Sequence, residues 1–138
     1  MFAKSSAALV AVLIATIVTT AGAYAACTQA DAAGNWRVYA GAFDSGASWQ
    51  RCVFSVNAGG VVATTSYCLD SARRKAFVKN GSVKLVSGPQ CSFNGQFGLG
   101  TQTNKLTDLT LAPDKNSGGG VGTSAPGSDT FIFMFFRN

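Results

Sequence analysis

Thr130-Phe131-Ile132-Phe133-Met134-Phe135-Phe136-Arg137 is the most apolar stretch of the chain after its N-terminal leader. Successive side chains of a β-strand point to opposite faces, so this stretch places phenylalanines on one face and further apolar groups on the other. We therefore predict a central strand that is covered on both sides, with Asp129 and Arg137 as charged flanks that limit aggregation. The alternative is a strand that pairs with a partner or with another copy through its edge.

Seven shorter runs rich in β-branched and aromatic residues precede this stretch, and none of the segments after the leader has helical periodicity. They span residues 36–42, 48–56, 61–68, 75–79, 82–86, 92–97 and 106–111. Turn signals separate them, namely Ala58-Gly59-Gly60, Asn80-Gly81, Ser87-Gly88-Pro89 and Asn94-Gly95. The sequence predicts an all-β fold, a small antiparallel barrel or sandwich of about seven to eight short strands.

Two segments of this pattern carry more specific predictions. Asn80-Gly81 suits a type I′ turn, so it predicts a tight hairpin between the runs 75–79 and 82–86. Residues 112–129 are rich in Gly, Ser and Pro, which predicts a long flexible loop. Asp114 to Gly118 within it has too few oxygen ligands for a calcium loop.

The first 25 residues have the pattern of a secretory signal peptide. Lys4 precedes an apolar stretch at 7–18, and Ala23-Tyr24-Ala25 fits the small-residue rule for cleavage after Ala25, with Ala26 as the alternative. A retained transmembrane anchor is the competing interpretation. We expect a cleaved signal peptide at 1–25 and a single β-domain at 26–138, secreted or periplasmic, with no stable membrane span after cleavage.

The cysteines are Cys27, Cys52, Cys68 and Cys91, an even number, which in a small exported domain favours two disulfides. Cys52 and Cys68 lie symmetrically about Gly60, so a hairpin turning there brings them close enough to bridge. Cys27 and Cys91 would then form the second bridge. Four cysteines allow three pairings, and the spacing alone does not decide between them.

The residue inventory argues against several kinds of chemistry. The chain has no histidine and no Cys-x-x-Cys pair, which disfavours a metal site and a base-activated cysteine or serine nucleophile. Nucleotide-binding fingerprints are missing as well. We expect no catalytic residues, no metal, no cofactor and no enzymatic activity. The net charge is +5, but the one basic cluster, Arg73-Arg74-Lys75, is typical of a solvated turn, so no nucleic-acid partner is expected.

If the domain is a ligand-holding barrel, its large aromatic residues are the first candidates for the binding site. These are Trp36, Trp49, Phe54 and Tyr67. Aromatic side chains fill cores more often than they line ligand sites, so ordinary core packing is the alternative for each. The ligand-binding residues and the ligand therefore stay unknown at this point.

Gly34-Asn35-Trp36, followed by short strands and a disulfide pair, resembles the opening of lipocalin-like barrels, in particular bacterial metalloprotease inhibitors. Cys91-Ser92-Phe93-Asn94-Gly95 and the Gly-rich segment after it resemble a group of uncharacterised small exported bacterial β-domain proteins. The resemblance to the inhibitors implies an N-terminal segment that enters a protease cleft. The chain differs from them in having four cysteines and an added Gly-rich segment.

Three functions follow as hypotheses. The first is an exported, non-enzymatic binding module whose partner is an unknown protein or envelope component. The second is a lipocalin-like protease inhibitor. The third is a surface or structural assembly subunit that uses the C-terminal strand.

Overall fold

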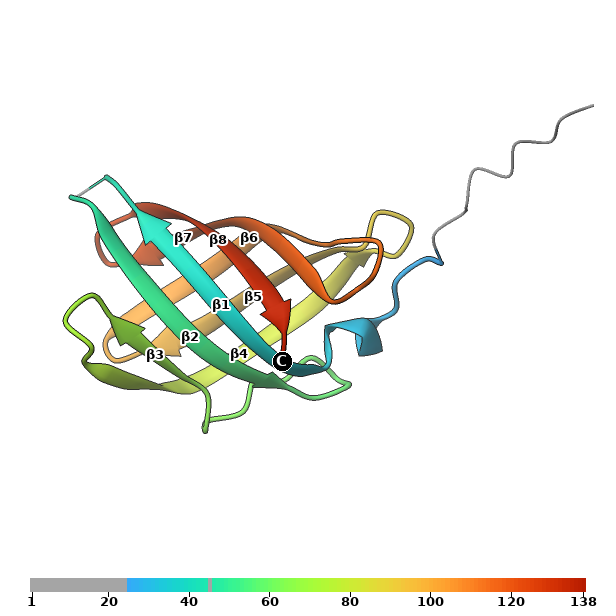
Figure 1. The fold of residues 1–138 in the computed structure, drawn as a ribbon, viewed down its shortest axis with the longest axis horizontal. Coiled ribbons are helices and arrows are strands. Elements are labelled where there is room, and N and C mark those ends of the chain that lie inside the picture. The colour runs from blue at the N-terminus through green and yellow to red at the C-terminus, as the bar shows by residue number, and fades with distance from the viewer. Residues whose placement is uncertain (1–24, 45) are drawn as a thin grey trace, which may run out of the picture.

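The computed structural model describes residues 25–44 and 46–138, which form one closed antiparallel barrel (Figure 1). A short 3-10 helix, η1 (Gln29–Ala32), comes first. The strands are β1 (Gly34–Ala42), β2 (Ser48–Val56), β3 (Tyr67–Asp70), β4 (Lys75–Ser87), β5 (Ser92–Leu99), β6 (Gln102–Leu111), β7 (Ser117–Ala125) and β8 (Asp129–Arg137). Neighbouring strands pair in sequence order and β1 closes the barrel against β8. The all-β prediction is confirmed, with a barrel and not a sandwich.

The predicted signal peptide lies outside the described residues, apart from its last one. Within the part of the chain that the structure describes, no helix has the length and apolar character needed to cross a membrane.

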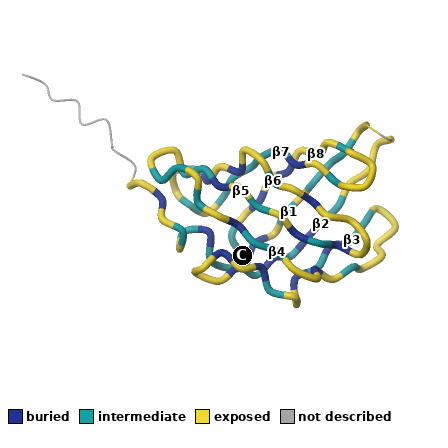
Figure 2. The backbone as a smooth tube through the Cα atoms, turned by 180° about the vertical axis from the view of Figure 1, so that it is seen from behind, coloured by how far each residue is buried: buried dark blue, intermediate teal, exposed yellow. Residues whose placement is uncertain are grey.

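Strand β8 is covered on one face only, so the prediction of a strand covered on both sides is wrong. Phe131, Phe133 and Phe135 are buried in the barrel, whereas the residues between them are exposed. The exposed set is Ile132, Met134 and Phe136. Buried and exposed positions alternate along the strands of the barrel (Figure 2). A closed barrel has a single interior, so alternate residues of every strand face outward whatever their character. Besides flanking the strand, Arg137 donates a hydrogen bond to the Asp31 carbonyl in η1.

Half of the Gly-rich segment is a strand, so the prediction of a flexible loop at 112–129 is wrong for residues 117–125. Gly118, Gly120 and Gly122 of β7 lie directly opposite Phe135, Phe133 and Phe131 of β8. A β-carbon on each of these glycines would lie less than 3.0 Å from the ring of its partner phenylalanine, closer than real β-carbons approach. The glycines therefore make room for three large rings inside the barrel, and the composition that suggested a loop is a packing requirement.

Asn80-Gly81 lies within strand β4, so the predicted hairpin there is wrong. The register against β5 shifts between Val78 and Asn80, which marks a β-bulge. Gly81 faces inward, where a β-carbon would lie 2.9 Å from Val62 and 3.0 Å from Phe97. The dipeptide thus serves a bend in a long strand, and bulges of this kind help a sheet to close. Asn94-Gly95 likewise lies within β5 and forms no turn.

Both predicted disulfides are present. Cys52 and Cys68 are direct partners in the register of β2 and β3, and their Cα atoms are 4.0 Å apart. Cys27 is bonded to Cys91, which ties the N-terminal segment to the start of β5. The run 61–68 is not one strand, since Val61 and Val62 make isolated bridges and β3 begins at Tyr67.

The barrel has two unlike ends. At one end lie η1, the C-terminus and the connections before β3, β5 and β7 (Figure 1). At the other end lie the connections before β2, β4, β6 and β8. We call the end with η1 the closed end and the opposite end the mouth.

Candidate functional site

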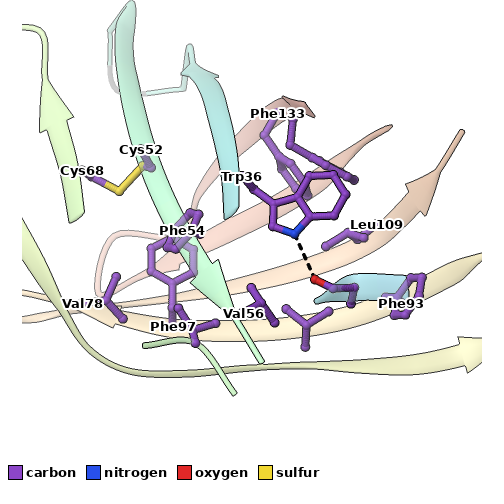
Figure 3. Close-up of a cluster of buried hydrophobic side chains, with 14 of the residues drawn as sticks. Trp36, Cys52, Phe54, Val56, Cys68, Val78, Phe93, Phe97, Leu109 and Phe133 are labelled. Carbon is purple, nitrogen blue, oxygen red and sulfur yellow. Dashed lines mark hydrogen bonds between the residues drawn. A yellow bond between two sulfur atoms is a disulfide. The ribbon is translucent and has the colours of Figure 1, made fainter. Parts of the chain in front are cut away.

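The barrel encloses a cavity of about 180 Å³. Aromatic rings form much of its wall, contributed by Trp36, Phe54, Phe93, Phe97, Phe131 and Phe133. Of these, Trp36, Phe54, Phe93, Phe97 and Phe133 are labelled in Figure 3. Eight-stranded barrels have an interior that side chains can fill or that can hold one small ligand. Here the small residues Ala40 and Ala42 of β1 lie on the cavity wall and leave part of the interior unfilled.

The closed end is sealed by η1 and the segment around it. Ala32 is buried, and its carbonyl accepts a hydrogen bond from Trp36 Nε1 at 2.9 Å (Figure 3). The Gln29 side-chain amide donates to the Val83 carbonyl at 2.9 Å and accepts from the Leu85 N–H at 2.8 Å. These contacts pair the Val83 carbonyl and the Leu85 N–H of β4 with the segment that closes the barrel.

Arg137 fastens η1 and the segment around it, which we call the plug, to the barrel. Its guanidinium donates hydrogen bonds to the carbonyls of Asp31, at 2.9 Å, Ala33 and Lys115, the last at 3.0 Å. The same group lies 4.3 Å from the ring centre of Trp36, within the range of a cation–π contact. One residue at the end of β8 therefore holds η1, the β6–β7 connection and the core tryptophan together.

Asp31 forms the second fastening. Its carboxylate accepts from the Thr28 N–H at 2.7 Å and pairs with Lys115 Nζ at 3.1 Å. The Thr28 N–H is the main cause that lowers the pKa of Asp31 below its usual value, and Lys115 adds to it. The carboxylate is thus held ionised by the contacts that fix η1.

The mouth is polar on its inner wall. Asn104 of β6 is the register partner of Ser124 of β7, which is in turn the register partner of Asp129 of β8. All three residues line the cavity, together with Gln50 and Gln102. Ser124 Oγ donates to Asn104 Oδ1 at 2.7 Å. The arrangement can offer hydrogen bonds to one end of a molecule whose other end lies among the rings.

The four aromatic candidates from the sequence divide between the inside and the outside. Trp36 and Phe54 are buried on the cavity wall, and Trp49 lines its rim with 52% of its surface exposed. Tyr67 is outside the barrel, where its ring packs against Phe77 at 6.2 Å under the Lys75 ammonium. Tyr67 is therefore not a candidate for a ligand site inside the barrel. Cys68 faces inward, where it forms its disulfide, so the adjacent Tyr67 must face outward.

The sequence did not single out Asn104, Ser124 or Asp129. The sequence predicts a loop at Ser124, and the strand that it predicts at 106–111 begins after Asn104, whereas β6 begins at Gln102 and β7 includes Ser124. A signal is present in the period-two pattern of Gly118, Gly120, Gly122 and Ser124. The three glycines are the register partners of the three inward phenylalanines of β8, and Ser124 continues the pattern opposite Asp129. Pairing these two patterns would have predicted β7 and placed Ser124 on the inner wall.

Charged groups elsewhere form ordinary surface contacts. Arg74 pairs with Asp70 at 2.8 Å across the β3–β4 turn, and the Arg74 N–H is the main cause that lowers the pKa of Asp70. Among residues 25–44 and 46–138, no three His, Cys, Asp or Glu side chains lie close enough together to hold a metal ion.

Comparisons with known proteins support the fold. No family model matches the chain, and no curated protein matches it either. Among solved structures, the barrel is similar to a protein described as the de novo design of a fluorescence-activating beta barrel. The two share 14% sequence identity with a TM-score of 0.60, over 77% of this chain and 93% of the designed one.

Proposed function

We propose that this protein is an exported, non-enzymatic binding module that holds a small apolar ligand inside its barrel. The observation that carries the proposal is the cavity, which is lined by aromatic rings, sealed at one end by η1 and edged with polar side chains at the mouth. Ligand sites in proteins are typically concave and mostly apolar, with a few convergent polar groups that fix orientation. The designed barrel of similar fold is described as fluorescence-activating, which is in keeping with a ligand-binding role.

The size of the cavity limits the ligand. An engineered apolar cavity of about 150 Å³ holds benzene, whereas sites for drug-sized molecules span about 300–1,000 Å³. The volume of about 180 Å³ lies close to the first figure. The expected ligand therefore has one ring, or an equivalent number of aliphatic carbons.

The disulfides support both the location and the choice between hypotheses. Disulfides persist in oxidising compartments, which favours a periplasmic or secreted protein. A lipocalin-like inhibitor needs an N-terminal segment that is free to enter a protease cleft. Here the Cys27–Cys91 bridge and the contacts of Asp31 and Gln29 hold that segment on the barrel end. This favours the binding module over the inhibitor.

The test is a titration of the purified protein with fluorobenzene, followed by ¹⁹F NMR. We expect a saturable change in the fluorine signal. Ala40→Phe, which adds a ring to the cavity wall, should abolish it, and Thr123→Phe, which adds the same ring to the exposed face of β7, should not. A wild-type protein with no saturable change, or equal responses from the two variants, would refute the proposal.

The outer face of β8 supports the assembly subunit as a second candidate function. Ile132, Met134 and Phe136 are each about half exposed, and Tyr39 of β1 packs against Phe136 with ring centres 6.5 Å apart. Exposed apolar patches often mark association surfaces. Sedimentation of the wild type and of Met134→Lys separates the two roles. A wild type that stays monomeric at high concentration excludes the assembly role and leaves the binding module untouched.

A further inference from the structure

Asn104 carries a buried donor that has no partner. The residue is 6% exposed, and its Oδ1 accepts from Ser124 while its Nδ2 has no hydrogen bond. A buried polar group without a partner destabilises the fold by about 1–3 kcal/mol. It is also the one buried side-chain nitrogen or oxygen in this condition among the described residues.

Other interior polar groups show how the chain treats such atoms. Ser66 is 2% exposed, and its Oγ accepts from the Ser55 N–H at 3.0 Å. Trp36 Nε1 and the Gln29 side-chain amide, both at the closed end of the barrel, are paired as well. The exception lies on the wall of the cavity, beside the mouth. An orphaned donor in that position is accounted for if a bound molecule supplies the acceptor.

We propose that the ligand is a neutral one-ring aromatic molecule with a hydrogen-bond-accepting oxygen, which accepts a hydrogen bond from Asn104 Nδ2. This inference rests on the proposed function and names its ligand class. Ser124 has a positioning role, because its hydroxyl occupies Asn104 Oδ1 and so leaves the amide nitrogen for the ligand.

The surroundings of Asn104 favour each part of that description. Phe97 is its register partner on β5 and packs edge-on against Phe54 at 5.0 Å, so a ligand that reaches the amide lies among rings. Aromatic pairs in such offset or edge-on geometry gain about 0.5–1.5 kcal/mol beyond their buried area. Asp129 lies two strands away on the same wall, and its carboxylate would repel an anionic ligand. A neutral carbonyl or ether oxygen satisfies the donor without that repulsion.

Two probes of the same shape test the inference. Acetophenone presents a carbonyl oxygen, and α-methylstyrene has a methylene group in its place. The affinities of both are measured by calorimetry for the wild type, for Asn104→Leu and for Asn94→Leu, a matched control on the exposed face of β5. We expect Asn104→Leu to lower the ratio of acetophenone affinity to α-methylstyrene affinity about tenfold, the equivalent of one hydrogen bond. Asn94→Leu should leave the ratio within about twofold of the wild-type value.

The outcomes separate the two proposals. If both probes bind and Asn104→Leu leaves their ratio unchanged, the donor role is refuted and the binding function stands. If neither probe nor fluorobenzene binds the wild type, the binding function is refuted and this inference with it. Should Asn104→Leu fail to fold, NMR of the wild type decides. The Asn104 side-chain amide signals should move downfield with acetophenone and not with α-methylstyrene, and equal shifts would overturn the inference.

Discussion

The two ends of the barrel treat their polar groups in opposite ways. At the closed end, the side chains of Gln29, Trp36 and Arg137 are all paired with backbone atoms. At the mouth, Asn104 keeps a buried donor free, although Ser124 lies against it. Contacts that stabilise the fold are thus concentrated at the end that η1 seals. The unpaired donor at the mouth is what the proposed binding role leads us to expect.

This contrast predicts that substitutions at the closed end lower the free energy of unfolding and that substitutions at the mouth do not. Natural proteins commonly show such a trade-off between stability and function at binding sites. Four variants, each with a control, test it in order of decreasing expected effect.

Removal of the Cys27–Cys91 bridge should have the largest effect. Its two cysteines are 64 residues apart, and closing a loop of that size lowers the entropy of the unfolded chain by the equivalent of about 4 kcal/mol. We expect the Cys27→Ala/Cys91→Ala protein to lose that much in a guanidinium unfolding experiment. The Cys52→Ala/Cys68→Ala protein, whose cysteines are 16 residues apart, should lose about 3 kcal/mol. A loss below about 1 kcal/mol for the first variant would mean that the plug is held without its bridge.

The disulfides were predictable because they depend on count, compartment and symmetry about Gly60, all of which the sequence contains. The barrel class was predictable for a similar reason, since short runs with period-two alternation imply β-structure whatever the pairing. The two errors at glycines share one cause. Local propensity predicts a turn at Asn80-Gly81 and a loop at the Gly-rich β7, whereas the glycines there make room for side chains from elsewhere in the barrel.

The site was less predictable than the fold. Trp36 and Phe54 could be chosen as large aromatics, but which face of a strand points inward depends on register and on bulges. At the β6 bulge the register shifts between Thr107 and Thr110, so both Leu106 and Leu109 line the cavity despite their odd spacing. A period-two count from Leu109 or Leu111 would therefore put Asn104 on the outer face. No local pattern reveals that shift.

Arg137→Met should have the next largest effect. The substitution removes the hydrogen bonds to the carbonyls of Asp31, Ala33 and Lys115 and keeps much of the apolar stem. Hydrogen bonds to charged groups contribute about 1.5–3 kcal/mol, and because these act as one unit we expect a total loss of about 2 kcal/mol. Thermal and chemical unfolding measure it. Arg37→Met, on the exposed face of β1, is the control. An equal loss of stability there would contradict the proposed role of Arg137 in fastening the plug.

Asp31→Asn tests the plug through pH. The folded state lowers the pKa of Asp31, so its carboxylate stabilises the fold above the unfolded value of about 3.8, and this contribution disappears as pH falls through the folded pKa. At pH 7 we expect the variant to be less stable by about 1 kcal/mol. In acid, once the pH has fallen below the folded-state pKa of Asp31, the two proteins should converge. Asp108→Asn, on the outer wall, should show little difference at either pH, and a gap for Asp31→Asn that persists in acid would contradict the electrostatic role.

Asn104→Leu should have the smallest effect, and of opposite sign. Leucine is close to asparagine in size and removes the unpaired Nδ2, while Ser124 Oγ loses its acceptor. Removing a buried donor without a partner gains about 1–3 kcal/mol, and the lost hydrogen bond offsets about 1 kcal/mol of that gain. We expect the free energy of unfolding to rise by about 0.5–1 kcal/mol in urea titrations, with Asn94→Leu unchanged. A fall of about 1 kcal/mol or more would show that Asn104 stabilises the barrel, and the contrast between its two ends would then fail at the residue on which it most depends.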